Sequence, residues 1–337
     1  ANVTFVVTDG ELKITKRGAG DDKVTLTAAD NTVTYDGRAH GAKLNAAGEI
    51  EVGTSYTITN LAEGHSVKTV AISGSETNAG VYPGKLVPSG AVIVDKEGNE
   101  VTENYEVTYV NGTLTINKYT QKVTVTVIEN SATVNYDGKE HSVYGYKSMA
   151  ANNALYTIKG SVEETPTEAW TAKGTNAGEY PVGIKAGDFK NINENFADVE
   201  FVIVDGALVI DPISAKVTVT ITENSATYTY DGTEHSVSGY ESMTADNVLY
   251  DVETSVTETA TEAWTAKGTN AGRYDVGIVA GDFVNTNTNF TNVEFVIVDG
   301  ALKIDPISDK VIVTITENSA TVTYDGKEHS VTGYKSM

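Results

Sequence analysis

The sequence predicts an all-β protein made of tandem β-sandwich modules of about 94 residues each. Three observations predict this fold class. A fixed order of turn and strand motifs recurs along the chain, valines alternate with threonines inside each copy, and no window of ten or more residues has a convincing helical period. The chain has 337 residues, which is enough for two or three domains that each bury a core.

The repeat is clearest between two copies that begin at Lys122 and Lys216, 94 residues apart, and that are identical at about three-quarters of their positions. Each copy opens with a lysine and a valine-threonine run, continues with Tyr-Asp-Gly, His and Asn-Ala-Gly-Xaa-Tyr, and closes with Asn/Asp-Gly before an apolar segment. A more distant copy precedes them. We therefore expect three whole modules between two partial ones: 1–19 as the end of a module, 20–118 as module one, 119–214 as module two, 215–308 as module three, and 309–337 as the beginning of a module.

The strands are predicted from the alternation. Val123, Val125 and Val127 alternate with threonines, which is the two-residue period of a strand with one buried face. The Tyr-Asp-Gly sequence that follows predicts a tight hairpin turn in every copy, because glycine accepts positive φ angles. Seven to nine strands per module are expected.

The Asn-Ala-Gly-Xaa-Tyr motif precedes a strand and is similar to the tyrosine corner of immunoglobulin-like sandwiches. It favours an Ig-like sandwich for each module, with short proline-containing joints that predict an extended, semi-rigid rod. A β-grasp module is the alternative, but it requires a helix. The segment 161–173 is the one weak helix candidate, and Pro166 interrupts it.

Composition narrows the class of function. The formal net charge of -22 disfavours nucleic acid and anionic membrane surfaces as partners. The absence of cysteine excludes disulfides and thiolate metal sites. No apolar stretch approaches the length of a membrane span, and we expect any export signal or wall anchor to lie outside this sequence.

With these motifs and the closing segment 104–116 (NYEVTYVNGTLTI), the chain resembles the MBG and YDG-type repeat domains of large bacterial cell-surface proteins and adhesins over essentially its whole length. Modules two and three differ from the pattern in the closing segment and by an added Gly-Tyr-Xaa-Ser-Met at 145–149 and 239–243. The resemblance implies an extracellular module that forms arrays at the bacterial surface, with mucin or glycan adhesion for some members. It implies no enzymatic residues.

A structural role is predicted for the repeated turn and corner residues. The histidine after each Tyr-Asp-Gly has no second histidine or cysteine at ligand spacing, so we expect it to bond turn backbone and not to bind metal. Trp170 and Trp264 align with Ile72 of module one and are expected in the core. The residues assigned structural roles are Tyr136, Gly138, His141 and Tyr180 in module two, and Tyr230, Gly232, His235 and Tyr274 in module three.

Two candidate sites remain. Tyr146 and Tyr240, in the added segment, are the best-placed aromatics for a ligand-binding loop. Each module also opens with a lysine and carries an Asn or Asp seven residues before its closing Asn/Asp-Gly. A self-formed isopeptide bond between them would release ammonia or water, a loss that the intact mass would reveal. The pairs are Lys23 with Asn104, Lys122 with Asp198, and Lys216 with Asn292.

The sequence thus predicts a non-enzymatic, cofactor-free structural stalk of a bacterial surface adhesin, with the modules spacing a distal binding region on the order of 100 Å from its anchor. Its expected partners are the neighbouring modules of the same chain. One alternative is that each module is a weak glycan- or mucin-binding unit that acts by avidity. A further alternative is a self-assembling filament or coat in which identical chains pair through edge strands.

Overall fold

The computed structural model describes all residues except 167 and 261–263. The chain divides into two compact units. Unit 1 comprises residues 1–132, 141–173 and 179–209, and unit 2 comprises 133–140, 174–178 and 210–337. Module one therefore lies in unit 1, module three lies in unit 2, and module two contributes to both.

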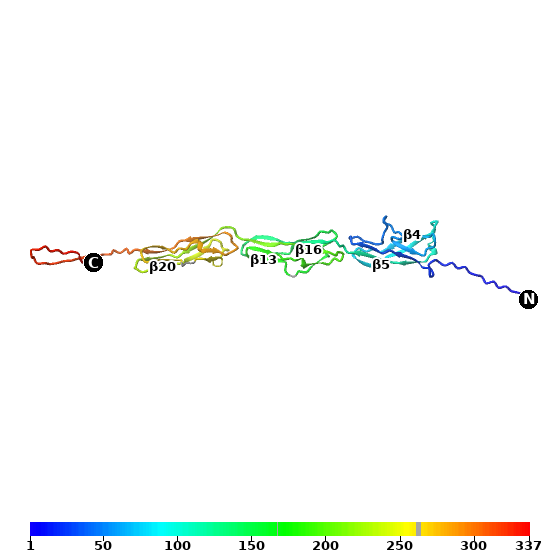
Figure 1. The fold of residues 1–337 in the computed structure, drawn as a ribbon, viewed down its shortest axis with the longest axis horizontal. Helices are drawn as coiled ribbons and strands as arrows, with labels where there is room; N and C mark the ends of the chain where they lie inside the picture. Colours follow the sequence, from blue (N-terminus) through cyan, green and yellow to red (C-terminus); the bar gives the residue numbers. More distant parts are fainter. Residues whose placement is uncertain (167, 261–263) are drawn as a thin grey trace. The chain divides into compact units, whose positions relative to one another are not determined.

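Module one is a sandwich of two sheets. One sheet has the order β3-β1-β6 and the other β2-β7-β5-β4. The labelled strands β4 and β5 are drawn in blue to cyan (Figure 1). Its strands are β1 (Val24–Ala28), β2 (Asn31–Thr34), β3 (Tyr56–Thr59), β4 (Ser66–Ser73), β5 (Gly80–Val94), β6 (Val107–Val110) and β7 (Gly112–Asn117).

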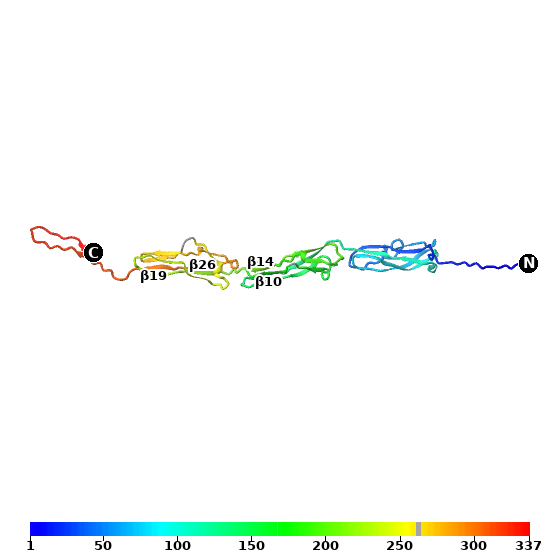
Figure 2. The same ribbon diagram turned by 90° about the horizontal axis from the view of Figure 1, so that it is seen from below.

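Module three has two three-stranded sheets, β21-β18-β26 and β19-β27-β24, and two strand pairs, β20-β23 and β22-β25. Figure 2 labels β19 and β26, which belong to different sheets. The strands are β18 (Val217–Glu223), β19 (Ala226–Thr229), β20 (His235–Ser238), β21 (Tyr240–Ala245), β22 (Val256–Glu258), β23 (Thr265–Gly268), β24 (Gly272–Asp275), β25 (Phe283–Asn285), β26 (Val293–Val298) and β27 (Ala301–Asp305).

Module two repeats these elements. Within unit 1, β8 pairs antiparallel with β11 and parallel with β16, and β12 pairs with β15. The strands are β8 (Val123–Glu129), β9 (Ala132–Asn135), β10 (His141–Tyr144), β11 (Tyr146–Ala151), β12 (Val162–Glu164), β13 (Thr171–Gly174), β14 (Gly178–Pro181), β15 (Phe189–Asn191), β16 (Val199–Val204) and β17 (Ala207–Asp211). Beyond the modules, β28 (Thr316–Glu317) pairs with β29 (Tyr334–Ser336).

The first two strands of a module run parallel to its last two. In module three, β18 pairs with β26 and β19 with β27, both in parallel. The chain passes from one sheet to the other twice at the same level, between β18 and β19 and between β26 and β27. At this level Ala301 N–H donates to Ser225 Oγ over 3.2 Å. Module three is consequently entered at one end and left at the opposite end (Figure 1).

The predicted alternation and fold class are confirmed. Val123, Val125 and Val127 have no exposed surface, and the threonines between them are half-buried. The tyrosine corner is also present, since Tyr82 Oη donates to Asn78 O over 2.9 Å and Tyr274 Oη donates to Asn270 O over 3.0 Å. Together with the sheet pairing, these features define tandem Ig-like β-sandwich modules.

The β-grasp alternative does not fit. The described residues form one α-helix, the four-residue α1 (Val252–Ser255), and three 3-10 turns: η1 (Thr102–Asn104), η2 (Ala186–Asp188) and η3 (Ala280–Asp282). The helix candidate 161–173 instead contains β12 and the start of β13, while residue 167 lies outside the described residues. Among the described residues, module one has seven strands, within the expected seven to nine, whereas modules two and three have ten short strands each.

The hairpin predicted at Tyr-Asp-Gly is wrong. In module three, β19 before the turn pairs with β27, whereas β20 after it pairs with β23. The physical reason is an Asx turn: the Asp231 carboxylate accepts the N–H and the hydroxyl of Thr233. Gly232 supplies the positive φ of 80° that this turn requires. The turn therefore carries the chain between sheets.

A buried glutamate at the end of the first strand ties each of the later modules together. The Glu223 carboxylate is 4% exposed and accepts Ile278 N–H at 2.7 Å and Gly300 N–H at 2.8 Å. Glu129 does the same for Ile184 at 2.6 Å and Gly206 at 2.7 Å. The glycine is obligatory, since a Cβ on Gly300 would lie 2.3 Å from Asn224 O. This contact explains the Asp-Gly motif.

We predict that the double variant E129Q/E223Q lowers the free energy of unfolding by about 1 to 3 kcal/mol for each module. A glutamine has one carbonyl oxygen, so one of the two buried N–H groups loses its acceptor. Urea denaturation followed by circular dichroism measures the change. The matched control E200Q/E294Q acts on half-exposed glutamates paired with Lys122 and Lys216 and should cost less than about 1 kcal/mol. Equal effects of the two double variants would contradict this assignment.

Candidate functional site

Side chains of successive modules meet at a contact that is built twice, and we call it the joint. In unit 1, Tyr35 of module one packs edge-on against Phe196 of module two, with ring centroids 5.5 Å apart and planes at 71°. In unit 2, Tyr136 of module two packs in the same way against Phe290 of module three, at 5.8 Å and 74°. Such edge-to-face pairs are favourable beyond the area that they bury.

An asparagine beside each phenylalanine makes two hydrogen bonds across the joint. Asn195 Oδ1 accepts Ala79 N–H over 2.6 Å, and Asn195 Nδ2 donates to Asn78 Oδ1 over 3.1 Å. Asn289 repeats both bonds with Ala177 at 2.5 Å and Asn176 at 3.1 Å. The Asn-Ala-Gly-Xaa-Tyr motif therefore has two roles in module one. Its tyrosine holds the backbone carbonyl of Asn78, while the Asn78 side chain and the Ala79 N–H bond to the neighbouring module.

A leucine contact completes the joint at the turn glycine. A Cβ on Gly37 would lie 3.1 Å from Leu155 Cδ2, and a Cβ on Gly138 would lie 3.3 Å from Leu249 Cδ2. The Tyr-Asp-Gly turn thus lies directly against the next module. Glycine is suited to this position for two reasons: it adopts the positive φ of the turn, and its lack of a side chain lets the leucine approach.

The linker itself is bonded to the joint. Tyr119 N–H donates to Asn195 O over 2.8 Å, and Ala197 N–H donates to Tyr119 O over 2.9 Å. At the second joint Ile213 makes the same two bonds, at 2.8 Å to Asn289 O and 3.0 Å from Thr291 N–H. The linker is therefore paired in both directions with the module that it leads into.

Sequence reasoning assigned structural roles to Tyr136 and Gly138 but missed their partners. Asn195 with Phe196 and Asn289 with Phe290 stand at the same place in modules two and three, and Asn104 with Tyr105 occupies that place in module one. That Asn-aromatic pair was the available signal. It lies more than 110 positions from the motif that it contacts, so no local pattern connects the two.

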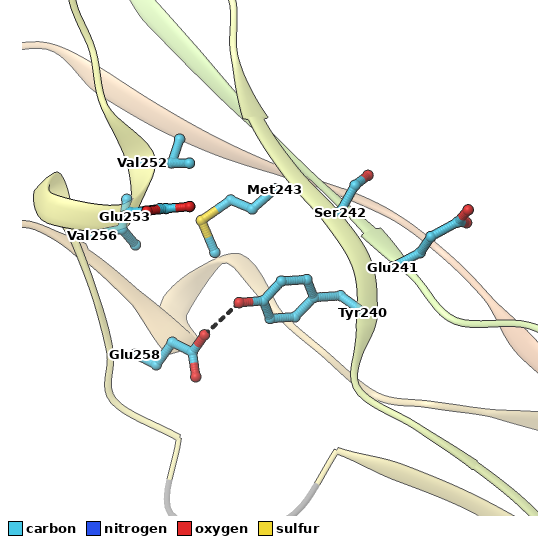
Figure 3. Close-up of a pocket in the computed structure, with 8 residues that line it drawn as sticks. All are labelled: Tyr240, Glu241, Ser242, Met243, Val252, Glu253, Val256 and Glu258. Atoms are coloured by element: carbon cyan, nitrogen blue, oxygen red, sulfur yellow. Dashed lines mark hydrogen bonds between the residues drawn. The ribbon is translucent and has the colours of Figure 1, made fainter.

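The predicted ligand residues Tyr146 and Tyr240 lie at the start of strands β11 and β21, and not in a loop. Tyr240 lines a cavity of about 320 Å³, together with Met243, Val252, Val256 and Glu258. Figure 3 shows its hydroxyl directed at Glu258, to which it donates over 2.7 Å, and the Met243 side chain between the ring and the start of α1. Glu241, Ser242 and Glu253 complete the lining.

These two tyrosines are weaker acids than an ordinary tyrosine, because their pKa values are raised. The hydrogen bond to Glu164, followed by burial and the charge of that carboxylate, raises the pKa of Tyr146 to about 12. The hydrogen bond to Glu258 raises the pKa of Tyr240 in the same way. Both phenols stay protonated in the folded protein at neutral pH and act as hydrogen-bond donors.

Trp264 lies beside Tyr240 and packs against the core of module three, as the sequence predicted. Its ring stacks on Phe283 with centroids 5.5 Å apart and lies 6.2 Å from Tyr240. The indole N–H donates to Asp282 Oδ2 over 2.9 Å, and Trp170 makes the equivalent bond to Asp188 over 2.8 Å. The tryptophans are therefore half-buried supports of the tyrosine and not exposed stacking platforms.

The isopeptide lysines lie beside other acids. Lys122 Nζ is 2.7 Å from Glu200 Oε2 and Lys216 pairs with Glu294, with all four side chains about half exposed. The charge of Asp198 acts on Lys122 less strongly than Glu200 does. Lys122 and Lys216 thus make ion pairs with the neighbouring parallel strands β16 and β26, and the cross-link of Lys23, Lys122 or Lys216 stays a prediction.

The repeated histidines bond a carboxylate where backbone was expected. His235 Nε2 lies 3.1 Å from Asp231 Oδ1, and His40 lies 2.8 Å from Asp36 Oδ1. Hydrogen bonds from Thr233 and then His235 hold the pKa of Asp231 at about 2. Each pair stabilises the turn that carries the joint tyrosine and glycine.

Within the described parts of the chain, no group of three or more His, Asp or Glu side chains is arranged to hold a metal ion. In the same parts of the chain, no helix is long and apolar enough to span a membrane.

No protein-family model and no curated protein sequence matches this chain. Among solved structures it is similar to the N-terminal eight Ig domains of Down Syndrome Cell Adhesion Molecule isoform 1.30.30, at 8% identity and a TM-score of 0.18, over 89% of this chain and 45% of that one. It is also similar to the N-terminal four Ig domains of Dscam1 isoform 7.44, at 10% identity and a TM-score of 0.16, over 84% of this chain and 72% of that one. The chain thus spans less than half of the first of these structures.

We predict a stability change at high pH that depends on Tyr146. Its pKa is raised in the folded state, so its contribution to the free energy of unfolding is full below the ordinary tyrosine pKa of 10.0 and is lost as the pH rises towards 12. Chemical denaturation of the natural chain and of Y146F should show a stability difference that is constant below that range and shrinks within it. Parallel pH profiles of the two proteins would contradict the prediction.

Proposed function

We propose that this chain is a structural spacer in which joints of one design hold successive Ig-like modules in series, as part of a bacterial cell-surface adhesin. The observation that carries the proposal is the repetition of the joint. The same tyrosine-phenylalanine pair, double asparagine hydrogen bond and leucine-glycine contact occur between modules one and two and between modules two and three.

A spacer needs modules that are entered and left at opposite ends, and the parallel pairing of the first and last strands supports this. From 217 to 229, the first two strands of module three cover about 40 Å at roughly 3.3 Å per residue. If the joints are fixed, the end-to-end length of the array grows by one module length for each module. If the joints rotate freely, the average end-to-end length grows more slowly than that. Its partners under this proposal are the neighbouring modules, and it acts without a catalytic residue or cofactor.

The test measures the distance between modules one and three. Because the chain has no native cysteine, two introduced cysteines in exposed strands of these modules can carry spin labels for a pulsed dipolar measurement. We expect a narrow distance distribution that broadens in N195A/N289A, since each alanine removes two hydrogen bonds across a joint.

The matched control is N270A, which changes the asparagine of the Asn-Ala-Gly-Xaa-Tyr motif in module three and lies outside both joints. It should leave the distribution unchanged. A broad distribution in the natural chain, or no broadening in N195A/N289A, would sink the spacer proposal.

A second candidate function is glycan or mucin binding at the Tyr240 cavity, with avidity from repetition. It is favoured by the cavity's mixed lining, in which a phenol, a thioether and carboxylates lie within one concave surface. Binding of the whole chain to a glycan and mucin array tests it. Under this candidate, Y240F/Y146F loses the signal and Y144F, which changes an exposed tyrosine outside the cavity, retains it. A blank array with folded natural chain would refute it.

A further inference from the structure

The concave surface around Tyr240 in module three recurs in module two around Tyr146, and we call the two copies the Tyr240 surface and the Tyr146 surface. Tyr146 Oη donates to Glu164 Oε1 over 2.7 Å, as Tyr240 Oη does to Glu258 Oε1. Each phenol ring lies 6.2 Å from a tryptophan ring, measured between centroids. The apolar residues of both surfaces are partly buried against the core of their module: Met149, Ile158 and Val162 in module two, and Met243, Val252 and Val256 in module three.

The two surfaces differ in charge. Eight residues line the Tyr240 surface, and at six of these positions module two has the same residue or, in one case, isoleucine in place of valine. The other two positions both reverse charge, since Glu241 corresponds to Lys147 and Glu253 corresponds to Lys159. The two linings therefore differ by four formal charges, while their aromatic, apolar and hydrogen-bonding groups stay the same.

The side chains at the two reversed positions are accessible in both modules. All four are exposed, and none of them forms an ion pair within the described parts of the chain. Figure 3 shows Glu253 pointing from α1 towards β21, and Glu241 on the far side of that strand. Because the modules repeat, Lys159 stands beside the centre of the Tyr146 surface and Lys147 at its outer rim.

The carboxylates near the Tyr146 surface already have partners or nearby cations. Glu164 accepts the Tyr146 hydroxyl, and Glu163 stands opposite Lys190 in the pairing of β12 with β15. Together with the two lysines at the reversed positions, these groups comprise three cations and two carboxylates. None of the corresponding positions in module three holds a cation, and Asp251, the N-cap of α1, adds a carboxylate there. The Tyr146 surface therefore attracts an anion and the Tyr240 surface repels one, in a chain with a formal net charge of -22.

The groups of the Tyr146 surface match the chemistry of a sugar that carries an acid group. A concave surface with an aromatic ring and a few polar groups is typical of a small-molecule site. The Glu164 carboxylate, held by Tyr146, can accept a hydrogen bond from a sugar hydroxyl. Lysine ammonium groups form charge-assisted hydrogen bonds with sulfate or carboxylate oxygens.

We propose that the Tyr146 surface binds an anionic saccharide, a sugar that carries a sulfate or a carboxylate, and that the Tyr240 surface excludes it. Lys159 and Lys147 contact the acid group and determine the specificity. This inference rests on the second candidate function, glycan binding, and names the class of glycan that one module selects.

Titration of the natural chain with a monosulfated N-acetylglucosamine and with glucuronic acid, each beside its uncharged parent sugar, tests the inference. Backbone amide chemical shifts report the two surfaces separately within one molecule. We expect the charged sugars to shift the amides of Met149 and Val162 and to leave those of Met243 and Val256 in place. The preference over the uncharged sugars should be about tenfold, as two exposed charge contacts allow, and should shrink with added salt.

Two reciprocal double variants exchange the charges between the surfaces. K147E/K159E gives module two the charges of module three and should lose the preference for charged sugars. E241K/E253K gives module three the charges of module two and should create a second site, with shifts at Met243 and Val256. Each variant carries residues that the other module already accommodates at exposed positions, so both should stay folded, and unchanged shifts elsewhere in the chain verify this.

Equal binding of charged and uncharged sugars, or equal binding at both surfaces, would overturn the charge selectivity and leave the glycan candidate standing. Inorganic sulfate that binds as tightly as the sulfated sugar would overturn the saccharide assignment, because an adventitious ion only would then explain the shifts. No shift with any sugar would refute this inference together with the glycan candidate. The spacer proposal is separate from all of these outcomes, since the distance measurement between modules tests it.

Discussion

Each module depends on the parallel pairing of its first strands with its last. In module three β18 and β19 lie beside β26 and β27, and the buried Glu223 bonds the backbone at the point where both pairs change sheet. A parallel pair cannot be closed by a short turn, so the chain must return through the intervening strands before the module is complete. The same pairing leaves the two ends of the module on opposite faces, which is the geometry that a serial array requires.

The joint follows from that geometry. Because the chain leaves through β27, the face around its end carries the Tyr-Asp-Gly turn and the Asn-Ala-Gly corner, the two motifs that define the repeat in the sequence. Within each module these motifs connect sheets and hold a tyrosine corner. Towards the next module, they present a ring, a backbone N–H and an asparagine side chain to one Asn-Phe pair. One set of residues therefore serves both the fold of a module and its attachment.

The sequence was sufficient for the features that depend on neighbouring residues. Alternation located β8 and β18, and the Asn-Ala-Gly-Xaa-Tyr spacing located the tyrosine corner, because both are local patterns. The sequence did not reveal which strands pair. The glycine of Tyr-Asp-Gly fits a hairpin turn and an Asx turn equally well, and only the pairing of β19 with β27 decides between them. The short helix α1 was not anticipated, since four residues give no helical period. Tyr240 was expected in a ligand-binding loop, but it lies on strand β21 beside a cavity, and its contact with Glu258 depends on a strand 18 residues away.

The joint is also where the copies diverge in charge while the hydrogen-bonding residues stay the same. Asn78, Asn176 and Asn270 keep their identity, and the residue three positions after each is valine, glutamate or arginine. Uniform asparagine contacts supply attachment, and variable charges at the rim can distinguish one neighbour from another, since electrostatic complementarity contributes chiefly to specificity.

Amide hydrogen exchange at three equivalent alanines tests the joint most directly. Ala79 and Ala177 donate their N–H groups to Asn195 and Asn289, whereas Ala271 stands at the same place in module three without an acceptor among the described residues. The three amides share one local motif, so differences in exchange report the neighbouring module. Slow exchange at Ala79 and Ala177 with fast exchange at Ala271, in dilute protein, is the result that the joint predicts. Equally fast exchange at all three would contradict it.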